Sequence, residues 1–104
     1  MSDSNINKYV VEAVGTFFFL SIILQTLNDS NVGPHSVAIG LLAAIYFGAS
    51  VSGAHFNPAV SFVMFLENKL TLGLLVAYVI SQYVGAAAAW KFNELVLKKL
   101  IVLN

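Results

Sequence analysis

The sequence predicts an all-α membrane protein built from three transmembrane helices and one re-entrant half-helix that enters the membrane without crossing it. Its composition is 59% hydrophobic and only 10% charged, whereas a soluble domain carries about a quarter charged residues. Three apolar segments approach the ~20 residues that an α-helix needs to span the ~30 Å hydrocarbon core of a bilayer. A fourth apolar segment is far too short. At 104 residues the chain is expected to form a single membrane domain, residues 1–104.

The first spanning helix is expected at about residues 9–27. One lysine, Lys8, precedes this apolar run, so the segment could be mistaken for a signal peptide. The run is longer than the ~7–15 residues of a signal-peptide core, and no small-residue cleavage pattern ends it. We therefore interpret it as a retained membrane helix, followed by a polar turn that contains Asp29, Gly33 and Pro34.

The second and third spanning helices are expected at about residues 37–51 and 72–92. Small residues recur along one face of each. Such faces allow membrane helices to approach each other closely. We therefore expect tight helix packing at Gly40, Ala44 and Gly48 on the second span and at Gly85 and Ala89 on the third.

A re-entrant loop and half-helix are expected at about residues 52–66. The apolar stretch at residues 58–66 would form a helix of only ~13 Å, less than half of the bilayer core. It cannot span the membrane, yet it is too apolar for water. The loop before it is then irregular backbone at membrane depth, which is tolerated only inside protein or along a water-filled cavity. The sequence therefore predicts a water-filled cavity near the bilayer midplane.

The half-helix begins at Asn57 and Pro58, which suit the cap and the first position of a helix. The Asn57 oxygen is expected to accept a hydrogen bond from the N–H of Ala59 or Val60, which leaves the NH₂ group as a donor aimed into the cavity. The helix N-terminus adds roughly half a positive charge at the same place. Water must then present its oxygen, and a cation or hydrated proton is disfavoured.

The loop before the cap is expected to supply acceptors. The carbonyl groups of Gly53, Ala54 and His55 have no helical partner and would form a ladder of acceptors for water or hydroxyl groups. Gly53 and Ala54 are small, so the backbone can face the cavity directly. Donors at Asn57 and acceptors along the loop together predict a pathway for neutral, hydrogen-bonding solutes.

The stretch SGAHFNPAVS at residues 52–61 resembles the first asparagine-proline-alanine loop of the aquaporin and aquaglyceroporin family, the major intrinsic proteins. Glu12 and Gly15 are similar to residues of the family's first helix, and Gln82 and Gly85 to residues of its third. The resemblance implies a multi-pass membrane protein with half of a six-helix fold. It also implies a passive channel for water and small neutral solutes such as glycerol, with Asn57, Pro58 and Ala59 as the pore motif and Glu12 hydrogen-bonded to the loop.

The chain departs from the family pattern because it carries one such loop, of the first-half type. Val60 stands where the family's second-half loop has an arginine. The family's pore combines two inverted halves, so the resemblance implies that a second half is needed. An antiparallel pair of this chain would supply both halves, and the family's further assembly implies a tetramer of such pores, surrounded by membrane lipid.

The distribution of lysines leaves both membrane orientations open. Orientation follows the bias of lysine and arginine between the two sides. The two sides are nearly balanced, so the opposite insertions that an antiparallel pair requires are expected to be allowed. Lys8 and Lys69 lie on one side, and Lys91, Lys98 and Lys99 on the other.

The resemblance also implies four constriction positions, counted from the motif asparagines of the two halves. With this chain used for both halves, they are Val37, Ile45, Ala54 and Val60. This ring has no aromatic residue and no charge. Because pore diameter and electrostatic barriers set selectivity in such channels, we expect glycerol-sized neutral solutes to pass as well as water.

Two other functions remain open on the sequence alone. A small proton-coupled exporter would use Glu12, since a carboxylate within the membrane is a functional candidate by default. The other is a non-conducting half that requires a separate second-half partner. The chain has no cysteine, no paired carboxylates, no phosphate-binding loop and no basic surface. We therefore expect no enzyme activity, no metal, no cofactor and no nucleic-acid partner.

Overall fold

The computed structural model describes residues 3–97 and 99–100, and this part of the chain is helical apart from short turns and one loop. The described residues form four α-helices in succession, and three of these helices are long and apolar enough to cross a membrane. The predicted all-α fold, with three spanning helices and one half-helix, is therefore confirmed. The helices are α1 (Asp3–Asn28), α2 (Pro34–Ser52), α3 (Pro58–Leu66) and α4 (Leu72–Phe92), and a π-helical turn, η1 (Asn93–Leu97), follows α4.

Two helices start earlier than the apolar pattern indicates. α1 begins at Asp3, before the expected residue 9, because a helix can continue into the polar headgroup region. α2 begins at Pro34 rather than at residue 37, since proline suits a first helical position where the missing N–H costs nothing. After α4 the helix continues as η1, and residues 98 and 101–104 lie outside the described residues.

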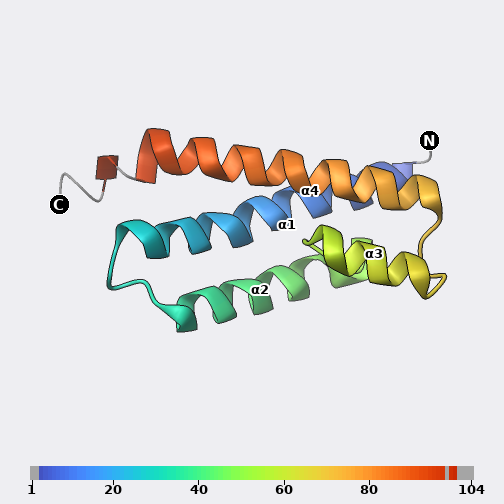
Figure 1. Ribbon diagram of the computed structural model, residues 1–104, viewed down its shortest axis with the longest axis horizontal. Helices are drawn as coiled ribbons and strands as arrows, with labels where there is room; N and C mark the ends of the chain where they lie inside the picture. Colours follow the sequence, from blue (N-terminus) through green and yellow to red (C-terminus); the bar gives the residue numbers. More distant parts are fainter. Residues whose placement is uncertain (1–2, 98, 101–104) are drawn as a thin grey trace.

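α1 lies at the centre of the bundle and packs against both α4 and α2 (Figure 1). α1 and α4 run in the same direction, and α2 runs against them. α3 packs against α4, and it begins partway along the bundle rather than at either end. The loop before α3 is consequently placed deep between the ends of the long helices.

The small residues predicted to mediate close packing are buried. On α2 the buried positions include Gly40, Ala44 and Gly48, and on α4 they include Gly85 and Ala89. These small side chains bring α2 and α4 close to α1, which fixes the positions of the polar groups described below.

Candidate functional site

The loop between α2 and α3 is held in an unusual backbone conformation. Gly53 ends α2 in the left-handed region, with φ 88°, and its N–H donates to the Ala49 carbonyl. Ala54 and Phe56 are also left-handed, each with φ 54°. A non-glycine residue in this region costs about 1–3 kcal/mol and persists only where its surroundings over-determine it. The loop therefore needs strong anchors.

The main anchor is the carboxylate of Glu12, which reaches the loop from α1. Its Oε2 accepts hydrogen bonds from Ser52 Oγ at 2.7 Å and from His55 N at 3.0 Å. Its Oε1 accepts from Phe56 N at 2.8 Å and from Gln82 Nε2 at 3.0 Å. Glu12 is 0% exposed. Hydrogen bonds to a carboxylate are about twice as strong as neutral ones, so this one side chain joins α1, α2, the loop and α4.

A second set of polar contacts supports the loop from the side of α3 and α4. His55 Nδ1 lies 2.8 Å from Ser61 Oγ, which also accepts from Gln82 Nε2 at 2.9 Å. The Tyr78 hydroxyl donates to the Ser52 carbonyl at 2.6 Å, and its ring lies 5.0 Å from the His55 ring. Neither Ser61 nor Tyr78 has a role that could be predicted from the sequence pattern. Their signal was positional: Ser61 lies one turn after Asn57, and Tyr78 one turn before Gln82.

Asn57 caps the first turn of α3. Its Oδ1 accepts from Ala59 N at 2.8 Å, which is the capping bond expected from the sequence, and Pro58 occupies the first helical position. Asn57 remains exposed. In the described part of the chain its NH₂ group has no hydrogen-bond partner, so it stays available as a donor at the positive end of the helix.

The loop carbonyl groups predicted to act as acceptors are also unengaged. Within residues 3–97 and 99–100, the carbonyl oxygens of Gly53, Ala54 and His55 accept no hydrogen bond. The loop therefore has free acceptors immediately before the free donors of Asn57.

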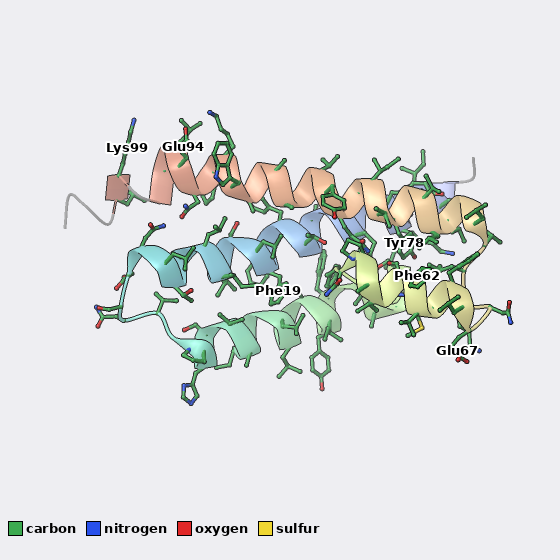
Figure 2. All side chains as sticks on the ribbon, in the orientation of Figure 1. Phe19, Phe62, Glu67, Tyr78, Glu94 and Lys99 are labelled. Atoms are coloured by element: carbon green, nitrogen blue, oxygen red, sulfur yellow. The ribbon has the colours of Figure 1, made fainter. Side chains whose placement is uncertain are left out.

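Two adjoining cavities extend from Asn57 toward the turn between α1 and α2, and both are lined by Phe19. The first, of about 260 Å³, is lined by Asn57, Pro58, Thr16 and Gln82 among others. The second, of about 590 Å³, is lined by Thr26, Pro34 and Val37 among others. We call the two together the Phe19 groove. Figure 2 shows Phe19 between α1 and α2, below α1 in that view.

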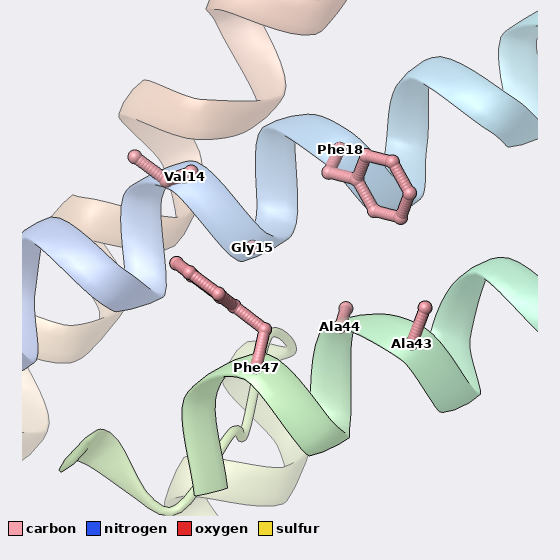
Figure 3. Close-up of a pocket in the computed structure, with 6 residues that line it drawn as sticks. All are labelled: Val14, Gly15, Phe18, Ala43, Ala44 and Phe47. Carbon is pink, nitrogen blue, oxygen red and sulfur yellow. The ribbon is translucent and has the colours of Figure 1, made fainter.

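A further cavity of about 310 Å³ lies between α1 and α2 (Figure 3). Every side chain that lines it is apolar, so it has no group that could orient water. Its lining residues are Val14, Gly15, Phe18, Ala43, Ala44 and Phe47.

The four predicted constriction residues lie at different places in the single chain. Val37 lines the Phe19 groove. Ala54 is in the loop, and Val60 on α3 is 36% exposed. Ile45 on α2 is 39% exposed and is not among the residues that line the groove. The predicted ring combines positions from two copies, so it stays a prediction.

Comparisons with known proteins agree with this geometry. The family model described as Major intrinsic protein matches residues 1–103. A protein described as probable aquaporin PIP-type pTOM75 from Solanum lycopersicum is 37% identical over 89 residues, which cover 74% of this chain and 31% of that protein. Aquaporin PIP1-3 from Arabidopsis thaliana is 35% identical, with the same coverage. No solved structure matches the chain.

The aligned region covers most of this chain but only a minor part of each relative. Aquaporin PIP1-2 from Musa acuminata, for example, is 36% identical over a region that covers 74% of this chain but 34% of that protein. The matched region therefore spans about a third of the length of these curated relatives.

Proposed function

Because the chain belongs to the major intrinsic protein family and is a multi-pass membrane protein, we propose that it forms a passive channel for water and small neutral solutes, completed by a second copy in antiparallel orientation. The observation that carries the proposal is the exposed Asn57 cap, which begins a half-helix partway along the bundle and opens onto the Phe19 groove.

Permeation would use the free donors and acceptors of the loop. A water molecule that passes the loop donates to the free carbonyl groups and then, at Asn57, accepts from the NH₂ group with its oxygen. At that point its own hydrogens face away from Asn57, so a continuous chain of water-to-water proton transfer is interrupted. The positive end of α3 adds a barrier to cations. Neutral solutes with hydroxyl groups meet the same sequence of partners.

A second copy is proposed because one chain leaves the pathway open on one side. Irregular backbone at membrane depth requires protein or water around it. A half-helix of ~13 Å covers less than half of a ~30 Å core, whereas two that meet end to end cover most of it. Thr16 Oγ1 and Gln82 Oε1 also lie buried without a hydrogen-bond partner among the described residues, beside the cavity at Asn57.

Antiparallel pairing fits both the architecture of transport proteins and the charges of this chain. Inverted repeats around a site at the bilayer midplane are common in transporters. By their positions in the sequence, two lysines, Lys8 and Lys69, belong to one side of the membrane, and three, Lys91, Lys98 and Lys99, to the other. This near balance does not strongly favour one insertion. Further assembly into a tetramer of pores is part of the proposal.

The solute range is proposed to include glycerol. If two copies supply the constriction, it is formed by Val37, Ile45, Ala54 and Val60 and carries neither an aromatic ring nor a charge. Without such groups the opening is wider and less polar, so exclusion of protons and cations rests on the two Asn57 residues and the ends of the two α3 helices.

The geometry gives no support to the alternative of a proton-coupled exporter. Such a protein needs a carboxylate that exchanges protons with water. Glu12 is fully buried, and four donors from Ser52, His55, Phe56 and Gln82 occupy its two oxygens. A carboxylate in this setting braces the loop.

Osmotic swelling of proteoliposomes that contain the purified chain alone tests the channel, and Asn57→Asp tests the motif. Aspartate also caps helices, so the fold is retained while a neutral donor becomes a charged acceptor. We expect fast swelling in water and glycerol gradients, and a fall of water permeability by about tenfold in Asn57→Asp, equivalent to ~1.4 kcal/mol. Asn68→Asp, in the exposed turn after α3, is the matched control and should swell like the wild type.

Swelling no faster than that of empty liposomes, from a chain that is folded by circular dichroism, would contradict a self-sufficient channel. The alternative of a half that needs a separate second-half partner would then stand.

Labelling of single cysteines tests the antiparallel pair, because the chain has no native cysteine. Ser30→Cys lies in the exposed turn between α1 and α2, and Glu67→Cys in the exposed turn after α3, at opposite ends of the bundle. We expect a membrane-impermeant thiol reagent to label about half of each variant in intact cells, because each copy inserts in either orientation. Complete labelling of one variant and none of the other would show a single orientation.

A further inference from the structure

The geometry points to Phe56 as the residue that positions Asn57. The ring of Phe56 is held in a gap between α1 and α2 that two glycines keep open, and we call this arrangement the lock. This inference rests on the proposed function only for its effect on conduction. The lock itself is a property of the loop.

The ring of Phe56 touches both helices where they have no side chain. Phe56 is 3% exposed. A Cβ atom added to Gly15 on α1 would overlap Cε1 and Cζ of the ring and would lie 2.7 Å from Cδ1. A Cβ atom added to Gly48 on α2 would lie 2.9 Å from Cζ of the ring and 2.8 Å from Cγ1 of Val11 on α1. The ring therefore occupies the space that two ordinary residues would fill, and this space admits a flat aromatic side chain only because both positions are glycine.

The backbone of Phe56 is fixed at a second point. Its N–H donates to Glu12 Oε1 at 2.8 Å, while its ring is held between the two helices. Two attachments on one residue leave little freedom in φ, which explains why a non-glycine residue keeps a left-handed φ of 54°. Asn57 is the next residue, about 3.8 Å further along the Cα trace. The position of the Phe56 ring therefore sets where the loop places Asn57, while the bond from Ala59 N holds the Asn57 carboxamide on the first turn of α3.

The lock can be opened from either side by a small change. Gly15→Ala places a methyl group where the ring lies, so the ring and the loop must move. Phe56→Leu removes the two ring atoms closest to Gly15 and leaves space, so the loop is loosened but not displaced. The double variant Gly15→Ala with Phe56→Leu restores a fit between a larger helix residue and a smaller loop residue. Gly73→Ala is the matched control, because nothing lies within 4 Å of a Cβ atom there.

Two measurements on these four variants test the inference. Hydrogen–deuterium exchange of residues 53–57 in proteoliposomes reports the loop and does not depend on conduction. Water permeability, compared with proton leakage measured by an enclosed pH dye, reports the orientation of Asn57. A residue that only filled space in the bundle would change the stability of the whole chain but not the ratio of proton leakage to water permeability.

We expect Gly15→Ala to accelerate exchange of the loop and to lower water permeability several-fold. Phe56→Leu should accelerate exchange and raise proton leakage several-fold relative to water permeability. The double variant should lie closer to the wild type than Gly15→Ala in both measurements, and Gly73→Ala should match the wild type.

Loop exchange that stays at the wild-type rate in Gly15→Ala and Phe56→Leu would overturn the lock. The lock would also be overturned if the double variant showed faster loop exchange and lower water permeability than either single variant, since the Phe56 ring would then not be the group that contacts Gly15. If the wild-type chain conducts no water but the exchange results are as expected, the proposed channel fails while the lock stands.

Discussion

Replacing Glu12 by glutamine is expected to release the α2–α3 loop and to remove most of the water permeability. Glutamine has nearly the same shape, but one carboxylate oxygen becomes an NH₂ group that cannot accept. Each oxygen accepts from one loop N–H, the part-buried one of His55 or the buried one of Phe56, so one of them loses its acceptor in either orientation of the amide. An orphaned buried donor costs about 1–3 kcal/mol. That cost falls on a loop already strained by its left-handed residues.

The effect is measured by swelling of proteoliposomes together with thermal unfolding in detergent. A loss of ~2 kcal/mol shifts the loop equilibrium by more than tenfold, since ~1.4 kcal/mol is a factor of ten. Glu67→Gln is the matched control, because Glu67 is exposed in the turn after α3. Wild-type permeability and stability in Glu12→Gln would mean that the four hydrogen bonds at Glu12 do not hold the loop.

The parts of this fold that follow from hydropathy and capping could be predicted from the sequence. The ~30 Å thickness of the bilayer core decides which apolar runs span it, and the stretch that starts at Pro58 is too short. The Asn57–Pro58 pair marks a helix start whatever surrounds it, because asparagine caps and proline begins helices for local reasons. The structure places α3 at Pro58–Leu66 and gives Asn57 its capping bond to Ala59.

The anchors of the loop were harder to predict because they join residues far apart in the chain. Glu12 and Phe56 are 44 positions apart, and Glu12 and Gln82 are 70 apart. Glu12 was assigned to the loop only through the family resemblance. Phe56, Ser61 and Tyr78 had no assigned role, since their types are ordinary for a membrane segment and only the packing of α1, α2 and α4 brings them to the loop.

Three adjacent phenylalanines that look equivalent in the sequence have different neighbours in the structure. Phe17, Phe18 and Phe19 form one apolar run, but the helix turns each to a different neighbour. Phe17 packs against Phe92 of α4 with 5.6 Å between ring centres, Phe18 lines the apolar cavity, and Phe19 lines the groove at Asn57. Only the neighbouring helices decide which of the three lines the cavity at Asn57, so hydropathy cannot distinguish them.

Replacing Gly85 by leucine is expected to have the largest effect on stability. A Cβ atom at Gly85 would overlap the Ala13 carbonyl oxygen and would lie 3.1 Å from Phe17 N. Both are backbone atoms of α1, which cannot rotate away as a side chain can. Helix propensity alone would predict that Gly85→Leu stabilises the protein, because leucine is more favourable than glycine in a helix interior by up to ~1 kcal/mol. Overpacking typically costs ~1–3 kcal/mol, occasionally more, so we expect Gly85→Leu to be clearly less stable than the wild type.

The comparison that isolates this contact is Gly73→Leu, in the same helix at a position where a Cβ atom meets nothing within 4 Å. Equilibrium unfolding in mixed detergent should show a loss for Gly85→Leu and none for Gly73→Leu. The loss should also reach the loop, because Gln82 lies one turn before Gly85 and donates to Glu12 over 3.0 Å. A helix pushed away from α1 carries that donor with it, so water permeability should fall together with stability. Equal stability of the two variants would mean that α4 does not approach the α1 backbone so closely. The connection between α4 and the α2–α3 loop would then depend on Ser61 and Tyr78 instead.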